Sequence, residues 1–319
     1  MPRRTVLMIP ATLFAMLAPL PAAAPPGNDV RLIALVPQSA PSSVLAPGAH
    51  VEKLAGDFIF TEGPTADRAG NVYFVDQDNN RILEYDTAGK LSTFLQPSGY
   101  SNGMTFDRAG HLIAAADEKN EMWSIDVVTK KATVLFGGTY EGKRLNGPND
   151  VWVDPRSGRI YFTDPYYQRK WWSRGPKESP EAVYVYSPSN HQLVRLSDDL
   201  IQPNGIIGTP DGRTLYVADI RAQKTYAYDI QKEGGLGGKR LFYALGSDGM
   251  TIDSEGHVYL TSGRQVHVID REGHEIESID VPELPSNVCF GGADRRTLFI
   301  TARTSLYAVR TRVHGVDPQ

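Results

Sequence analysis

Short runs of alternating apolar and polar residues, separated by Gly, Asp and Asn turns, recur along the chain from about residue 51 onward. After Asn102, for example, the pattern predicts four strands, at residues 103–107, 111–117, 121–126 and 132–136. Alternation over about four to eight residues, bounded by turn residues, is typical of antiparallel strands. No segment has the periodicity of a long amphipathic helix. The pattern therefore predicts an all-β chain built from four-stranded antiparallel units.

The four-stranded unit occurs six times, and each copy opens on one polar residue. The spacings between these polar residues are 40, 47, 55, 44 and 39 positions. A period near 40 residues with four strands per unit is typical of a β-propeller blade. The six opening residues are Glu62, Asn102, Asn149, Asn204, Asp248 and Asn287.

The two ends of the repeat region predict how the propeller closes. The last copy lacks a convincing fourth strand. Residues 51–54, which precede the first copy, have the pattern of a fourth strand that belongs to no preceding blade. We expect this N-terminal strand to complete the last blade, which closes a six-bladed propeller over residues 51–313 and leaves no open sheet edge. Residues 25–50 are rich in Pro, Ala and Ser and predict a linker or a surface wrap.

Two copies carry insertions, at residues 138–145 and 166–180. The second insertion contains Tyr166, Tyr167, Trp171 and Trp172. Aromatic residues in an inserted loop predict either a lid or substrate wall, or a cover for an exposed blade edge.

The first 24 residues predict a secretory signal peptide. Arg3 and Arg4 precede an apolar run at residues 6–20 and small residues at 21–24. The run is short for a membrane span, so we expect an exported protein, periplasmic or secreted, without membrane attachment once the signal is removed. Removing Arg3 and Arg4 takes the net charge from −4 to −6. An acidic chain without a basic cluster argues against a nucleic-acid partner.

The opening residues of the blades are also the candidate chemistry. The first strand of a propeller blade lines the central channel, so these residues converge at one mouth. The strongest metal ligands are Glu62, Asn149, Asn204 and Asp248. Two carboxylates and two carboxamide oxygens suit a hard divalent cation, above all Ca²⁺, with Zn²⁺, Mn²⁺ or Mg²⁺ as alternatives.

The remaining polar positions receive other roles. An isolated Asn-Gly or Asp-Gly dipeptide is an ordinary turn, but six polar positions in register favour a site. We assign Asn102 to the substrate pocket and expect Asn287 to be a structural turn residue. The single cysteine, Cys289, permits no intrachain disulfide and is expected to be a core residue.

Several motifs resemble the regucalcin/gluconolactonase family over residues 51–310. They are Thr61-Glu62-Gly63-Pro64, Leu145-Asn146-Gly147-Pro148-Asn149-Asp150, Pro203-Asn204-Gly205 and Ser247-Asp248-Gly249-Met250. Members of that family are six-bladed propellers with a divalent cation, usually Ca²⁺, in the channel. They hydrolyse sugar lactones, and some relatives hydrolyse phosphotriesters.

The resemblance implies roles for individual residues. Glu62, Asn204 and Asp248 match metal ligands, Asn149 matches a contact to substrate or metal, and Asp248 matches the general base. The animal aldonolactonases of the family carry Arg at the position of Gly147. Arg144 is the candidate that replaces it as a substrate contact.

The sequence therefore predicts a cation-dependent lactonase, in which the cation polarises the carbonyl group and an Asp248-assisted water attacks it. A carboxylate bound to a cation is a weak base, so Asp248 either accepts the proton or orients the water. Two alternatives stay open: a non-enzymatic propeller that binds a ligand or protein around a structural cation, and a phosphotriesterase-type hydrolase. No organic cofactor is expected, and the sequence leaves the lactone and the oligomeric state undefined.

Overall fold

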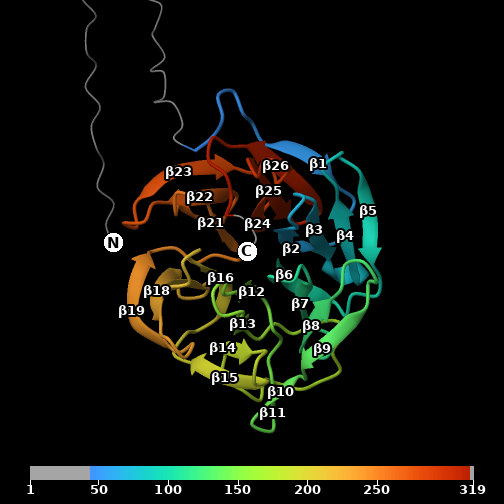
Figure 1. Cartoon of the computed structure of the whole chain (residues 1–319), viewed down its shortest axis with the longest axis vertical. Coiled ribbons are helices and arrows are strands. Elements are labelled where there is room, and N and C mark those ends of the chain that lie inside the picture. The colour runs from blue at the N-terminus through green and yellow to red at the C-terminus, as the bar shows by residue number, and fades with distance from the viewer. Residues whose placement is uncertain (1–43, 317–319) are drawn as a thin grey trace, which may run out of the picture. The chain divides into compact units, whose positions relative to one another are not determined.

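Consecutive antiparallel strands build the whole fold. The structure is a computed structural model, and it describes residues 44–316. The predicted signal peptide and residues 25–43 of the predicted linker lie outside these residues. Six four-stranded sheets surround a central axis, with the first strand of each sheet innermost (Figure 1). The helical structure of the described residues is one short 3₁₀ turn, η1 (Gln77–Asn79), so none of their helices could cross a membrane.

The first three blades follow the chain in order. Blade 1 contains β2 (Thr61–Ala66), β3 (Val72–Asp76), β4 (Arg81–Tyr85) and β5 (Leu91–Leu95). Blade 2 contains β6 (Ser101–Phe106), β7 (Leu112–Ala116), β8 (Glu121–Ile125) and β9 (Ala132–Phe136). A hairpin of β10 (Thr139–Tyr140) and β11 (Lys143–Arg144) occupies the first predicted insertion. Blade 3 contains β12 (Val151–Val153), β13 (Ile160–Asp164), β14 (Ala182–Ser187) and β15 (Gln192–Ser197).

The last three blades complete the ring. Blade 4 contains β16 (Pro203–Gly208), β17 (Thr214–Asp219), β18 (Lys224–Ile230) and β19 (Leu236–Tyr243). Blade 5 contains β20 (Met250–Ile252), β21 (Val258–Ser262), β22 (Gln265–Ile269) and β23 (Glu275–Asp280). Blade 6 contains β24 (Pro285–Gly291), β25 (Thr297–Ala302), β26 (Ser305–Arg310) and β1 (Glu52–Ala55).

The N-terminal strand closes the ring as predicted. β1 pairs antiparallel with β26, with Glu52 opposite Ala308, and becomes the outer strand of the last blade. Just before it, Val44 is fully buried against blades 5 and 6, and Leu45 bridges to Thr311. The six-bladed propeller with four antiparallel strands per blade is therefore confirmed.

Apolar side chains pack between blades rather than within one central core. The described residues contain six buried clusters, one at each interface between neighbouring blades. The second strands supply much of them because both of their faces are covered. All five residues of β3 are buried, for example. Removal of this apolar surface from water is the main term that stabilises the ring.

The first strands approach each other so closely that Gly must follow several of the polar positions. A Cβ atom on Gly63, which has a φ of +52°, would lie 2.1 Å from the carbonyl oxygen of Asn102. A Cβ atom on Gly249 would lie 2.0 Å from the side chain of Asn287. The dipeptides that resemble turns in the sequence are therefore points of contact between neighbouring blades.

Hydroxyl groups connect one blade to the first strand of the next around this crowded end. Thr163 of β13 donates to the carbonyl oxygen of Asn204 at 2.7 Å. Thr261 of β21 donates to the carbonyl oxygen of Ser286 at 2.9 Å, and Ser286 donates to that of Thr61 at 2.6 Å. These bonds fix the strands that carry the candidate ligands, since the groups involved are buried.

Thr163→Val tests this connection. The change keeps the β-branched shape but leaves the carbonyl oxygen of Asn204 without the hydroxyl donor. We expect the free energy of unfolding to fall by about 1–3 kcal/mol, because an unsatisfied buried carbonyl is costly. Urea unfolding monitored by circular dichroism gives the value. Thr133→Val on the exposed part of β9 is the control, and an equal effect of the two changes would contradict the assignment.

Candidate metal centre and active site

The predicted site residues converge on the end of the channel where the first strands begin. Glu62, Asn102 and Asn204 lie near the start of β2, β6 and β16, and Asn149 and Asp248 lie two residues before β12 and β20. The pairing shifts register next to the polar residue in β2, β6 and β16. Such bulges commonly re-aim side chains beside active sites.

Asn204 and Asp248 are in direct contact. The Nδ2 amide of Asn204 donates to Oδ1 of Asp248 and to the hydroxyl oxygen of Tyr167, both at 2.9 Å. Asn204 is 1% exposed, and its Oδ1 has no hydrogen-bond partner. Oδ1 of the buried Asn102 has no partner either. Two buried carbonyl-type oxygens at the mouth are thus without donors.

Asp150 is a buried carboxylate that the sequence analysis did not select. Its Oδ1 accepts the N–H of Val151 at 3.1 Å, and its Oδ2 accepts the N–H of Ile206 at 3.2 Å. The pKa of Asp150 is raised to about 7, chiefly by burial and also by the charge of Asp248. The two hydrogen bonds act in the opposite direction and lower it. The residue directly after Asn149 therefore adds a third carboxyl group.

The three carboxyl groups interact electrostatically. The pKa of Glu62 is well above its ordinary value, chiefly because of burial and then because of repulsion by Asp248 and Asp150. Burial also raises the pKa of Asp248 to about 6, although Asn204, Arg303 and Arg169 lower it. Glu62 is stabilised in part by the N–H of Gly63 at 2.6 Å. Placing these charges together is unfavourable unless a proton or a cation compensates them.

Asn287 was predicted to be a turn residue, and this prediction is wrong. It lies inside β24, where its Nδ2 donates to Oε2 of Glu62 at 3.1 Å and its Oδ1 accepts the N–H of Val288. The dipeptide pattern suggested a turn, whereas the close approach of β24 to β2 brings the amide to the carboxylate. Asn287 therefore supports a candidate metal ligand.

The chemistry of the donor set fits a hard divalent cation. Glu62 and Asp248 offer buried or half-buried carboxylates, and Asn204 offers an unpaired carbonyl-type oxygen. Oxygen-only sets of this kind are what Ca²⁺ prefers. Within residues 44–316, no group of three or more His, Cys, Asp or Glu side chains has the arrangement of a metal site. A cation here would accordingly depend on carboxamide oxygens as well as carboxylates.

The aromatic insertion reaches the same mouth. Its Tyr167 hydroxyl accepts the amide of Asn204, and the guanidinium of Arg169 lies 5.2 Å from the centre of the Tyr167 ring. Nε of Arg169 donates to the buried Oδ2 of Asp117 at 2.7 Å. Trp171 stacks on Tyr100 with ring centres 4.2 Å apart. The insertion is therefore anchored on blades 1 and 2 and contributes a wall beside Asn204.

The insertion also explains why residue 147 is a glycine. A Cβ atom on Gly147 would lie 2.5 Å from Oδ1 of Asp117 and 2.8 Å from the ring of Trp172. The indole N–H of Trp172 donates to the carbonyl oxygen of Asp117 at 2.8 Å, which holds the ring in that place. A side chain at position 147 therefore does not fit with the insertion as it lies.

Arg144 lies apart from the carboxyl groups of the mouth. It belongs to the outer hairpin strand β11, and its guanidinium is 3.7 Å from the carboxylate of Glu178. Trp171, Trp172 and Arg174 line a smaller hollow with it. The cation that interacts with Asp248 from the insertion is Arg169, since its charge lowers the pKa of Asp248.

The fold and the mouth together define a class: a six-bladed β-propeller with a carboxylate and carboxamide site at one end of its channel. Residues 60–304 match the family described as "SMP-30/Gluconolactonase/LRE-like region". Because this match covers most of the chain, the protein belongs to that family.

Individual relatives agree with this assignment. A gluconolactonase from Zymomonas mobilis is 29% identical over 304 residues, covering 86% of this chain and 84% of the relative. A gluconolactonase structure from Xanthomonas campestris has a TM-score of 0.77 and 28% identity, covering 84% of this chain and 91% of that one. Regucalcin from Agrobacterium tumefaciens, described as a calcium-binding protein, has a TM-score of 0.71 and 20% identity, covering 85% and 96%; this likeness shows the fold alone.

The role of Asp117, which anchors the insertion, can be tested through the pH dependence of the unfolding free energy. Burial raises the pKa of Asp117 from 3.8 to about 6, although Arg169 and Arg174 lower it. Since the folded pKa is above the unfolded one, the stabilisation is complete below about pH 4 and is lost as pH rises through about 6. We expect the wild-type advantage in unfolding free energy over Asp117→Asn to shrink between those values.

Urea unfolding of both proteins across this range measures the difference. Asp280→Asn, at an exposed position of β23, is the control. A difference between wild type and Asp117→Asn that stays constant or grows with pH would contradict the raised pKa. Asp164, whose own pKa is raised by burial and by the charge of Asp117, stays in both proteins.

Proposed function

We propose that this protein is an exported lactonase that depends on a divalent cation, with Ca²⁺ as the cation that the donor set favours. The observation that carries the proposal is the mouth itself: mutually repelling carboxyl groups of Glu62, Asp150 and Asp248 beside an Asn204 oxygen that lacks a partner. Membership of a family with gluconolactonases among its members supports the reaction class. The substrate is then a lactone small enough to enter the mouth.

Glu62, Asn149, Asn204 and Asp248 would hold the cation. A bound divalent cation supplies Lewis acidity toward a carbonyl oxygen. Asn287 keeps the Glu62 carboxylate in place through the 3.1 Å hydrogen bond. Asn204 likewise positions Asp248. Asn102, with its unpaired buried Oδ1, is available to accept a hydroxyl of the substrate.

The reaction adds water to the carbonyl carbon and breaks the ring C–O bond, so the product is a hydroxy acid. Asp248 is the residue assigned to orient the water and to receive its proton, because its carboxyl group is half-buried at the mouth and interacts with both Asn204 and Arg169. The ring oxygen that leaves must gain a proton. We assign the supply of this proton to the hydroxyl of Tyr167, which accepts the amide of Asn204 at 2.9 Å.

Chelation tests the cation requirement. We expect purified protein to release acid from a panel of γ- and δ-lactones, to lose this activity with excess EDTA and to regain it with Ca²⁺. A pH indicator in weak buffer follows the reaction. Acid release that resists complete removal of metal would contradict the cation role, and no release from any lactone would favour a binding propeller instead.

Asp248→Asn tests the catalytic assignment, with Glu62→Gln as its partner and exposed Glu233→Gln as the control. We expect Asp248→Asn to lower kcat by about 100-fold or more, because it removes the group that receives the proton. Glu62→Gln should lower the metal content measured by mass spectrometry. Near wild-type kcat in Asp248→Asn with metal still bound would show that the role is wrongly assigned.

Tyr167→Phe tests the wall formed by the insertion. The change keeps the ring under Arg169 but removes the hydroxyl beside Asn204. We expect kcat/KM to fall by about 100-fold, because the change removes the hydroxyl assigned to protonate the leaving ring oxygen, with an unchanged metal content. Tyr166→Phe is the matched control, since that hydroxyl contacts Gln168. Equal activity of the two variants would show that the hydroxyl of Tyr167 has no role in the reaction.

A further inference from the structure

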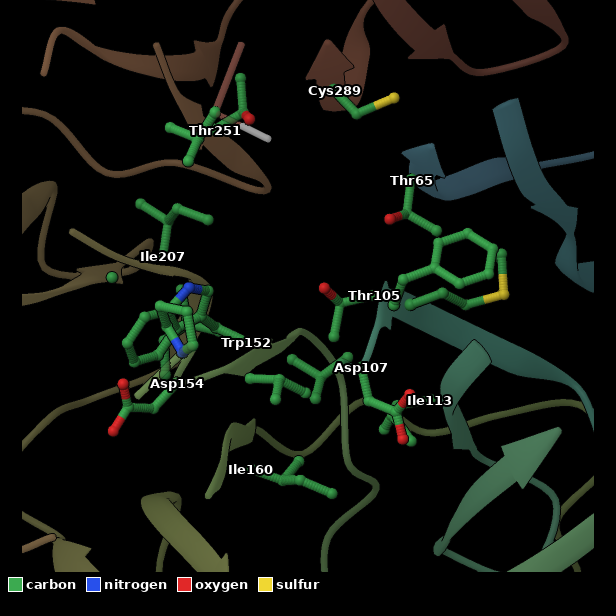
Figure 2. A pocket seen from close by; sticks show the side chains of 18 of the residues that line it. Thr65, Thr105, Asp107, Ile113, Trp152, Asp154, Ile160, Ile207, Thr251 and Cys289 are labelled. Atoms are coloured by element: carbon green, nitrogen blue, oxygen red, sulfur yellow. The ribbon is translucent and has the colours of Figure 1, made fainter. Parts of the chain in front are cut away.

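Beyond the polar positions, the channel contains a cavity of about 440 Å³ (Figure 2). Its walls include Thr65, Thr105 and Thr251, each three residues after the polar residue of its blade. Loops that connect first and second strands contribute Asp107 and Asp154 to its rim. These loops lie at the opposite end of the first strands from Glu62 and Asp248. The cavity therefore opens toward the second mouth of the channel.

Most of the wall is apolar. Figure 2 shows Ile160, Ile207, Trp152 and Cys289 around the hollow. The ring of Trp152 packs against the backbone of Gly208, where a Cβ atom would come within 2.3 Å of the indole. Only Gly permits this contact, so one side of the cavity is a flat aromatic surface held by the fold.

Polar groups interrupt the apolar wall at a few points. Figure 2 shows the hydroxyl oxygens of Thr65 and Thr105 on the side of the hollow, and Thr251 lies across from them. Among residues 44–316, none of these three hydroxyls has a hydrogen-bond partner in the protein. At the inner end, Asp150 and Asn287 also line the cavity. A few placed polar groups in a largely apolar hollow are typical of small-molecule sites.

The charges around the cavity are of both signs, so they favour neither an anionic nor a cationic ligand. The carboxyl groups of Asp107, Asp150 and Asp154 oppose an anion. The guanidinium groups of Arg108 and Arg295 oppose a cation. A cavity of this volume falls in the range of about 300–1,000 Å³ that small-molecule sites occupy.

We propose that this cavity is a second ligand site, which binds a neutral, mainly apolar ring compound carrying a hydroxyl, amine or carbonyl group. The apolar ring lies against Trp152 and Ile207, and the polar group bonds to the threonine hydroxyls. The cavity shares Asp150 and Asn287 with the metal centre at its inner end, but its apolar wall, the three threonine hydroxyls and the second mouth lie outside that centre. Ligand binding can therefore be measured separately from lactone hydrolysis.

The probe is 1-aminoanthracene, a neutral ring amine whose fluorescence rises in dry cavities, titrated against the full-length protein. We expect saturable one-to-one binding. Thr105→Phe and Thr251→Phe fill the cavity and should each weaken binding by about 10-fold or more. Thr133→Phe, on an exposed strand position, should leave it unchanged. Melting curves identify any variant that fails to fold, and a second measurement uses the wild-type chain alone.

Ligand-linked stability of the wild-type chain provides that second measurement. We expect saturating 1-aminoanthracene to raise the midpoint of thermal unfolding, and the rise to grow with the logarithm of the probe concentration. Three results overturn the proposal: no saturable binding, equal binding by the filled variants and the wild type, or an unchanged midpoint of thermal unfolding.

Discussion

Close approach of the six first strands around the channel axis is the constraint on which the site depends. The carbonyl oxygen of Asn102 occupies the space that a side chain at position 63 would need, and Asn287 does the same at position 249. With no room for side chains there, each polar residue lies directly against the next blade. Neighbouring blades therefore supply one another's hydrogen bonds, as Asn287 does for Glu62.

The same crowding concentrates negative charge in a place with little water. Glu62, Asp150 and Asp248 all have raised pKa values, and burial is the largest cause for each. Protonation would relieve the repulsion but would leave the oxygen of Asn204 without a partner. A hard cation would relieve both deficiencies at once, and this is the physical basis on which we propose a metal centre here.

The repeat pattern was enough to predict the blades, their closure and the convergence of the polar positions, because alternation and turn residues directly encode strands. Asp150 was not predictable in this way. It follows Asn149 where the strand has not yet begun, so the alternation that separates inward from outward residues does not apply. Tyr167 was missed as an individual residue because an aperiodic loop gives no sign of which aromatic side chain points to the channel.

The absence of a side chain at Gly147 affects the arrangement of the whole mouth. Trp172 and Asp117 fill the space over Gly147, so an arginine expected there from the family resemblance has no room. The insertion that excludes it carries Arg169, whose side chain is only 17% exposed and whose charge acts on Asp248. Asp117 fixes this guanidinium from one side, while Tyr167 and Trp171 lie under it. Arg169 is thereby held in one place beside Asp248, and the insertion can occupy its position only because residue 147 is glycine.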